Sequence, residues 1–269
     1  LLFVNTAHTG RDFGPTRLDA PSLDAAAPLL ARFKSGWDLA REPLFRAALI
    51  ETPQAPSRLL LCAHHLLVDL VSWSLILEEL TEAYRALEQG RAPRLPPAGP
   101  PPAPWVAALR RHYQSPAGLA ELPHWQATLA TEFRLPRALE PASWRMRDCA
   151  VLVQELDAET SARLTARARE DHGADPSILV LTALAGALAR WTGRERVVIE
   201  TEGHGRHLEA LVDAPDPTRG LGGYTAMHPL ALRLEGDDPA AWLAEVKRQM
   251  ADTPQQGVGF GVLRYLLER

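Results

Sequence analysis

Residues 58–73, RLLLCAHHLLVDLVSW, carry the residue types best suited to proton transfer in this chain. His64 and His65 follow the apolar run 59–63, which has the length of a strand. Because adjacent side chains on a strand point to opposite faces, one histidine can face a core while the other faces a cleft. Histidine titrates near neutral pH, so the second can act as a general base.

A second stretch, VVIETEGHGR at residues 197–206, delivers Glu202 from an apolar strand into a glycine-flanked turn around His204. Glycine allows backbone conformations that other residues avoid, and a close approach to a ligand. We predict that His65 and Glu202 meet across a cleft and move a proton to and from carbon. The alternative for this stretch is a simple tight turn with a surface glutamate and Arg206.

Other chemistries are less well supported. His64 and His65 can also be hydrogen-bonded core or edge residues, with Asp69 a plain helix cap. No cysteine or acidic cluster accompanies the histidines at metal-ligand spacing. The G-x-S-x-G element of serine hydrolases is absent. The glycine-rich stretches 218–229 and 254–261 lack a nucleotide-binding signature, so we set nucleotide binding aside.

Composition is ordinary for a globular protein: 269 residues, 46% hydrophobic, 23% charged and a net charge of −4, which does not favour a nucleic-acid partner. Cys62 and Cys149 are expected to be buried free thiols, which suits a reducing cytoplasm. No apolar run reaches transmembrane length, and residues 1–6 do not resemble a signal peptide, so no membrane partner is expected. The start at Leu1, without methionine, suggests a fragment.

The first half of the chain should position the histidines with a hairpin and two helices. A helix is expected over about 22–35, and strands over 45–50 and 58–65 on either side of a loop. A helix to about residue 89 follows, capped by Asp69 or Ser72 and ended by a glycine. Its expected apolar face comprises Trp73, Ile76, Leu77, Leu80, Tyr84 and Leu87.

Residues 91–105 are proline-rich and predict an extended strap, with short helices over 106–113 and 119–129. The second half predicts strands over 148–156 and 196–201 and from 230, and helices over 157–173, 178–191 and 239–250. The helix over 178–191 is apolar almost all round, which predicts burial. This alternation predicts the α/β class, with two lobes and a boundary near residue 140.

Four motifs in order resemble the epimerization domains of nonribosomal peptide synthetases, members of the condensation-domain superfamily. The family's HHxxxDGxSW pattern corresponds to residues 64–73, and its EGHGR motif to 202–206. GGYTAMHP at 222–229 approximates its GWFTxxYP motif, and PQQGVGFG at 254–261 meets its PxxGxGYG motif.

This resemblance implies two lobes, 1–140 and 141–269, each similar to chloramphenicol acetyltransferase and arranged as a V around a central tunnel. It implies inversion of the α-carbon of an aminoacyl or peptidyl thioester. That substrate is carried on the phosphopantetheine of a peptidyl carrier domain among neighbouring synthetase modules, with no cofactor or metal bound directly. The family's catalytic pair corresponds to His65 and Glu202. Other site positions are the loop residues His64, Asp69, Ser72, Gly203, His204 and Arg206, and the tunnel candidates Tyr224 and His228.

The sequence departs from the family pattern at several places. Leu70 stands where the family usually has glycine, which costs of order 1 kcal/mol if the backbone there needs a positive φ. Tyr224 and His228 replace the usual Phe and Tyr. The family's opening strand and helix and its closing NYLG-like segment are missing, which predicts a fragment lacking both ends.

In the expected mechanism, a base removes the α-proton on one face of the substrate and an acid returns it on the other. Free N–H groups at the helix start near Ser72 are expected to favour the enolate oxygen. Asp69 is expected to hold the loop by capping or by pairing with an arginine such as Arg46. The rivals are a condensation domain, which forms peptide bonds, and a catalytically silent carrier-docking module of the same fold.

Overall fold

The structure, a computed structural model, describes residues 14–53, 55–136, 145, 148–206, 209, 211 and 214–269. The chain forms two compact units. The first contains residues up to 107 together with 214–225, and the second contains 108–211 and 226–269. Within the second unit, Trp125 packs against Phe260. The expected lobe boundary near residue 140 stays a prediction.

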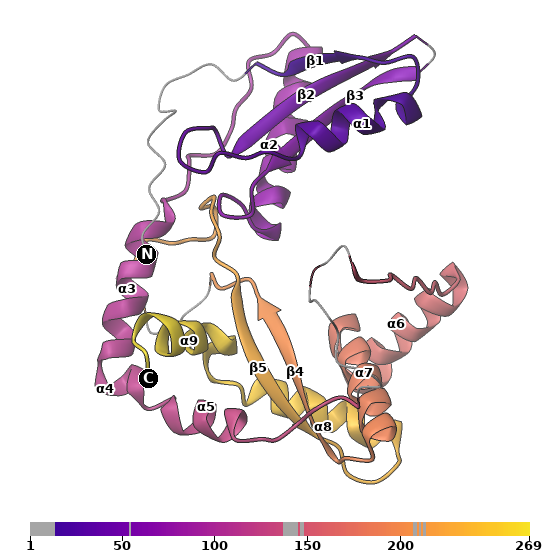
Figure 1. Ribbon diagram of the computed structural model, residues 1–269. Coiled ribbons are helices and arrows are strands. Elements are labelled where there is room, and N and C mark those ends of the chain that lie inside the picture. The colour runs from indigo at the N-terminus through magenta and orange to yellow at the C-terminus, as the bar shows by residue number, and fades with distance from the viewer. Residues whose placement is uncertain are drawn as a thin grey trace. The chain divides into compact units, whose positions relative to one another are not determined.

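The first unit is built on a three-stranded sheet, in the order β1 (Thr16–Asp19), β2 (Phe45–Thr52) and β3 (Ala55–Ala63) (Figure 1). β1 runs parallel to β2, and β2 and β3 form the predicted antiparallel hairpin. β3 starts earlier than expected and ends at Ala63, so the prediction that the strand extends to residue 65 is wrong. The pairing stops there because the chain turns, and Leu67 N donates to the carbonyl of His64 at 2.9 Å.

Helices α1 (Leu23–Phe33) and α2 (Leu70–Glu88) confirm two predictions. Gly90 follows α2 with φ +69°, a conformation that favours glycine. In the later part of the predicted apolar face of α2, the side chains of Leu77, Leu80, Tyr84 and Leu87 are exposed. Periodicity shows which residues share a face of a helix, but not that another element covers that face.

The second unit is built on a two-stranded antiparallel sheet of β4 (Arg196–Gly203) and β5 (Ala226–Arg233). The helices before this sheet are α3 (Pro102–Gln114), whose residues up to 107 belong to the first unit, α4 (Pro116–Leu119), α5 (Leu122–Leu129), α6 (Ala158–His172) and α7 (Pro176–Thr192). The elements after it are α8 (Pro239–Ala251), a 3₁₀ turn η2 (Pro254–Gly257), α9 (Val258–Gly261) and a π turn η3 (Val262–Leu266). The core between the sheet, α7 and α8 is made of Ala185, Val197, Leu230, Leu232, Leu234, Trp242 and Val246.

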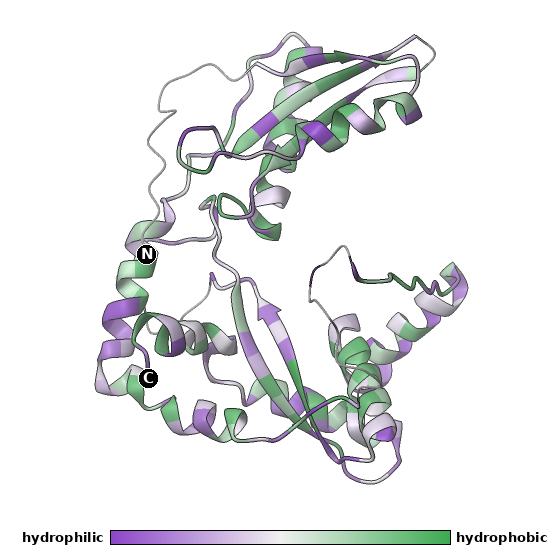
Figure 2. Cartoon of the chain, in the orientation of Figure 1, coloured by the Kyte–Doolittle hydropathy of each residue, from purple (hydrophilic) through white to green (hydrophobic). Residues whose placement is uncertain are grey.

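Three predictions for α3 and the chain after it need correction. α3 begins inside the proline-rich stretch, because proline is tolerated in the first turn of a helix, where no backbone donor is needed. The predicted strand over 148–156 is absent: residues 149–156 pair with no described strand and are exposed. α7 is hydrophobic over much of its length (Figure 2), yet Val180, Leu184 and Trp191 are exposed, so it is not buried all round.

Cys62 is half-buried and Cys149 is exposed, and both are free thiols. The expectation of a buried Cys149 is therefore wrong, because the strand that was to bury it does not form. In the described part of the chain, no single helix is long and apolar enough to cross a membrane. α6 and α7 pass that test only as a pair, bent by 97°.

Candidate functional site

The two histidines lie in the turn between β3 and α2. His64 N donates to Leu44 O at 2.8 Å, and the His64 Nδ1 accepts from Leu66 N at 3.1 Å, which fixes the ring. His65 is exposed, and its ring makes no hydrogen bond with any described residue. We expected one histidine to face a core and the other a cleft. His64 is half-buried and His65 is exposed, and a turn rather than strand alternation sets their directions. The His65 ring is accessible from solvent.

A buried network fixes this turn to the start of α2. Asp69 is 2% exposed and caps the helix: its Oδ1 accepts from Ser72 N at 2.7 Å and lies 2.8 Å from Ser72 Oγ. The other carboxylate oxygen accepts from Tyr224 N at 3.0 Å. Ser72 is fully buried, and its hydroxyl forms hydrogen bonds of 3.1 Å with both the N and the O of Gly222. The HHxxxD turn is thereby held to the GGYT segment, far away in sequence.

The predicted capping role of Asp69 is confirmed, but its suggested partner is not. Arg46 donates instead to Glu42 Oε2 at 2.6 Å and to the carbonyls of Phe33 and Ser35 at 2.8 and 3.0 Å. The Arg46 guanidinium therefore has three acceptors from residues that precede β2 in sequence, and none of them is Asp69.

The start of α2 offers fewer free donors than we expected. Ser72 N donates to the Asp69 side chain, and Trp73 N donates to the Asp69 carbonyl at 3.1 Å. The Asp69 carboxylate also occupies the positive end of the helix. This helix end therefore has fewer backbone donors to offer an anion than the sequence suggested. Leu70 does not have a positive φ and is 80% exposed, so leucine at the family's glycine position causes no backbone strain.

Tyr224 connects the same network to the proline-rich strap. Its N–H is bound to Asp69, and its hydroxyl donates to Pro100 O at 3.2 Å. A Cβ added at Gly222 would overlap the ring of Pro102, which explains why glycine is needed where the segment passes the strap. The Tyr224 side chain is buried in the first unit. Its role as a tunnel residue stays a prediction.

The sequence suggested that Glu202 lies in a turn, but in the structure it lies within β4. The strand register pairs Glu202 with Met227 and Thr201 with His228. Paired residues share a face of the sheet, so Glu202 and Met227 project from one face and Thr201 and His228 from the other. Glu202 and Met227 are exposed, whereas His228 is buried. Glu202 therefore stands on the open face of β4 and β5.

The residues after Glu202 form a compact turn. Gly203 ends β4, and Gly205 has φ +64°, a conformation that favours glycine. His204 is exposed, and its Nδ1 accepts from Arg206 N at 3.1 Å. Arg206 is buried. The two motif histidines, His64 and His204, thus use Nδ1 in the same way, accepting from the backbone N–H two residues ahead.

His228 supports β4 from behind. Its Nε2 lies 3.1 Å from Thr201 Oγ1, and its ring packs edge-on against Trp125 at 5.9 Å. Gly257 lies so close that an added Cβ would overlap the His228 ring. Burial lowers the pKa of His228, and His124 lowers it further, so the ring is held neutral at neutral pH. His228 packs inside the second unit, and its tunnel role stays a prediction.

The PQQGVGFG loop approaches Glu202 with an unusual backbone. Gln255 and Gln256 have φ of +45° and +52°, and non-glycine residues rarely adopt such values. A Cβ added at Gly203 would lie 3.6 Å from the Gln256 carbonyl. Two strained residues thus lie beside the strand that carries Glu202, which is the kind of place where strain accompanies function.

A half-buried carboxylate close to this loop was not foreseen. Glu121 accepts from Tyr113 Oη at 3.0 Å and from Trp125 Nε1 at 3.2 Å. The pKa of Glu121 is raised above its ordinary value, because burial raises it by more than the hydrogen bonds from Trp125 and Tyr113 lower it. Burial, and then Glu121, raise the pKa of Tyr113. Glu121 also touches Gly259, where a Cβ would overlap its carboxylate. No sequence pattern marked Glu121, because its partners come from separate helices.

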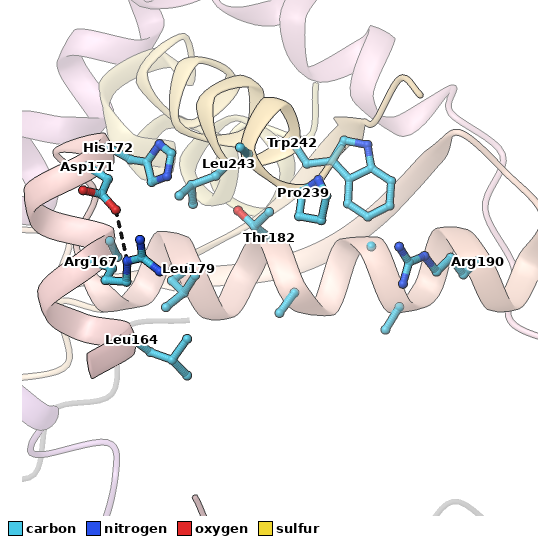
Figure 3. Close-up of a pocket in the computed structure, with 15 residues that line it drawn as sticks. Leu164, Arg167, Asp171, His172, Leu179, Thr182, Arg190, Pro239, Trp242 and Leu243 are labelled. Carbon is cyan, nitrogen blue, oxygen red and sulfur yellow. Dashed lines mark ion pairs between the residues drawn. The ribbon is translucent and has the colours of Figure 1, made fainter. Parts of the chain in front are cut away.

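A separate cavity of about 620 Å³ lies between α6, α7 and α8 (Figure 3). Its lining is mainly apolar, and an ion pair of 3.3 Å between Arg167 and Asp171 lies at its edge. None of the predicted site residues lines it. Within the residues that the structure describes, no group of His, Cys, Asp or Glu could hold a metal ion.

His65 belongs to the first compact unit and Glu202 to the second. Their meeting across a cleft remains a prediction. Each side chain separately is exposed, and each lies close in sequence to a histidine whose Nδ1 accepts a backbone hydrogen bond in the same turn or the one that follows the strand.

A condensation-domain family model matches residues 16–269. The chain belongs to the condensation-domain family. It is 34% identical over 238 residues to surfactin synthase subunit 1 of Bacillus subtilis, covering 87% of this chain and 7% of the relative. It is 35% identical over 230 residues to the chondramide synthase of Chondromyces crocatus, covering 83% of this chain and 6% of the relative.

Among solved structures, the epimerization domain from the third module of tyrocidine synthetase B matches with a TM-score of 0.83 and 27% identity. That match covers 93% of this chain and 58% of the solved one. The X-domain from teicoplanin biosynthesis matches with a TM-score of 0.74 and 26% identity, covering 97% and 59%. The first condensation domain of the CDA synthetase matches with a TM-score of 0.68 and 23% identity, covering 90% and 54%.

These comparisons confirm the mixed α/β fold of a condensation-superfamily domain of nonribosomal peptide synthetases. This condensation-family chain spans a small part of the curated relatives and about three fifths of the solved domains.

Proposed function

We propose that this condensation-family chain epimerizes the α-carbon of an aminoacyl or peptidyl thioester. The substrate is carried on the phosphopantetheine of a peptidyl carrier domain, within a cytoplasmic synthetase. The observation that carries the proposal is Glu202, which stands exposed on the open face of β4 at the start of the EGHGR motif. Forming a peptide bond needs no carboxylate at this position. The higher TM-score with a solved epimerization domain than with a solved condensation domain supports the same choice.

The chemistry requires one base and one acid. In one direction Glu202 removes the α-proton, leaving an enolate, and protonated His65 returns a proton to the opposite face. Glu202 is then protonated and His65 neutral, which is the state that catalyses the reverse inversion. No proton is gained or lost overall, and no cofactor is required. Asp69 and Ser72 keep the His65 turn in place, and His228 supports the strand behind Glu202.

The test is loss of α-deuterium from an aminoacyl thioester on a carrier domain, measured with this chain in its full-length protein. Glu202→Gln and His65→Ala should each abolish the exchange. The matched control is Glu200→Gln, which changes a carboxylate on the same face of β4, two residues earlier. It should leave exchange unchanged. Full exchange by Glu202→Gln contradicts the proposal.

The same assay separates the two rival functions. No deuterium loss, with peptide-bond formation between two loaded carriers, identifies a condensation domain. No reaction of either kind, with carrier binding intact, identifies a silent docking module.

A further inference from the structure

We propose that Met227 determines which substrates Glu202 can act on, and that it selects thioesters whose amino acid has an apolar side chain. This inference rests on the proposed epimerase function. It starts from the register of β4 and β5, which sets Met227 directly opposite Glu202 on the open face of the sheet.

The two side chains are immediate neighbours. Residues directly opposite in an antiparallel pair have Cβ atoms about 4.5–5.5 Å apart. Glutamate and methionine extend over a similar length, so the methyl end of Met227 reaches the height of the Glu202 carboxylate. To lose its proton, a substrate α-carbon must approach a carboxylate oxygen to about 3 Å. At that position, the groups on the α-carbon lie within reach of Met227.

Met227 is free to make that contact. Its side chain is 51% exposed, although it is large and apolar, and the core of the unit lies on the opposite face of the sheet. Methionine is flexible and polarizable, so it adapts to apolar groups of different shape. It also offers no partner to a charged side chain, which would lose water without compensation. The surface beside Glu202 therefore favours leucine-like or aromatic side chains over acidic ones.

The experiment compares α-deuterium exchange of leucyl, alanyl and glutamyl thioesters on one carrier domain, by the full-length protein and its variants. Met227→Ala should lower the ratio of kcat/KM for leucyl over alanyl by at least about 10-fold, since a missing apolar contact is worth about 10–200-fold in specificity. Exchange of the alanyl thioester should persist, which shows that the variant is folded. Met227→Lys should raise glutamyl relative to leucyl exchange.

The control is Val198→Ala, on the same face of β4 but about 13 Å from Glu202 along the strand. It should leave all three rates in their original ratio. If Met227→Ala and Met227→Lys leave the substrate ratios unchanged while exchange continues, the role of Met227 is overturned and the epimerase function stands. If the unaltered protein exchanges none of the thioesters, both proposals are overturned.

Discussion

Substituting Gly257 by alanine tests the packing behind Glu202. Gly257 has φ +83°, where an L-residue is strained by about 1–2 kcal/mol. The added Cβ would also overlap the His228 ring, and relief of such overpacking costs about 1–3 kcal/mol. We expect Gly257→Ala to lower the free energy of unfolding by about 2–5 kcal/mol. The control, Gly193→Ala, has φ +66° with nothing within 4 Å, so it should show the backbone strain alone.

Urea unfolding followed by circular dichroism measures both variants. With an m-value of about 2 kcal/mol/M, the midpoint of Gly257→Ala should lie roughly 0.5–1.5 M below that of Gly193→Ala. In the background of His228→Ala the overlap disappears, so Gly257→Ala should cost about 1–3 kcal/mol less there. Equal costs for the two glycine substitutions, or no coupling to His228, would refute the reasoning.

Three further predictions concern stability. Asp69→Ala leaves two buried N–H donors, one of them on Tyr224, without their acceptor, and should lower the free energy of unfolding by about 2–5 kcal/mol in urea titrations. Burial lowers the pKa of His228 below its ordinary 6.5, so the unfolded state binds the proton more tightly. The stability from this histidine is complete above about pH 6.5 and is lost as the pH falls; His228→Gln should lessen that loss in unfolding curves at about pH 7.5 and 5.5. Gln255→Gly and Gln256→Gly relieve a positive φ, and each should raise the melting temperature, with a gain of about 0.5 kcal/mol; a lower melting temperature would mean that the glutamine side chains stabilise the loop.

Elements whose ends are marked by local chemistry were predictable from sequence. α6 begins at its Asp157 cap and ends at Gly173 in a left-handed conformation, as the pattern indicated. The β2–β3 hairpin follows from two apolar runs and the short loop between them. The strand predicted over 148–156 does not form, because its formation depends on a partner strand and not on local sequence alone. Its composition favours a strand, but a strand exists only when another strand pairs with it, and residues 149–156 have no such partner in the described part of the chain.

In the candidate site too, the sequence indicated residues but not their distant partners. The family resemblance predicted Asp69, Ser72 and Tyr224 as site residues, but it could not show that Tyr224 N donates to the Asp69 carboxylate. It suggested Arg46 as the partner of Asp69 because an arginine and a carboxylate attract each other. The structure satisfies Arg46 with Glu42 and two nearby carbonyls. Contacts between residues far apart in sequence depend on the packing of whole elements, which composition does not encode locally.

The placement of Glu202 in a strand changes what must hold it in position. A turn would have relied on glycine conformations, whereas a strand fixes a side chain through its ladder and through the residues behind it. Those residues are Thr201 and His228, joined across the strands on the buried face. His228 in turn requires glycine at position 257, and that loop places Gln256 beside Gly203. His228 of the GGYTAMHP motif and Gly257 of the PQQGVGFG motif therefore support the strand that carries Glu202. Under the proposed function, a change at His228 or Gly257 should alter exchange by Glu202 although neither residue shares its face of the sheet.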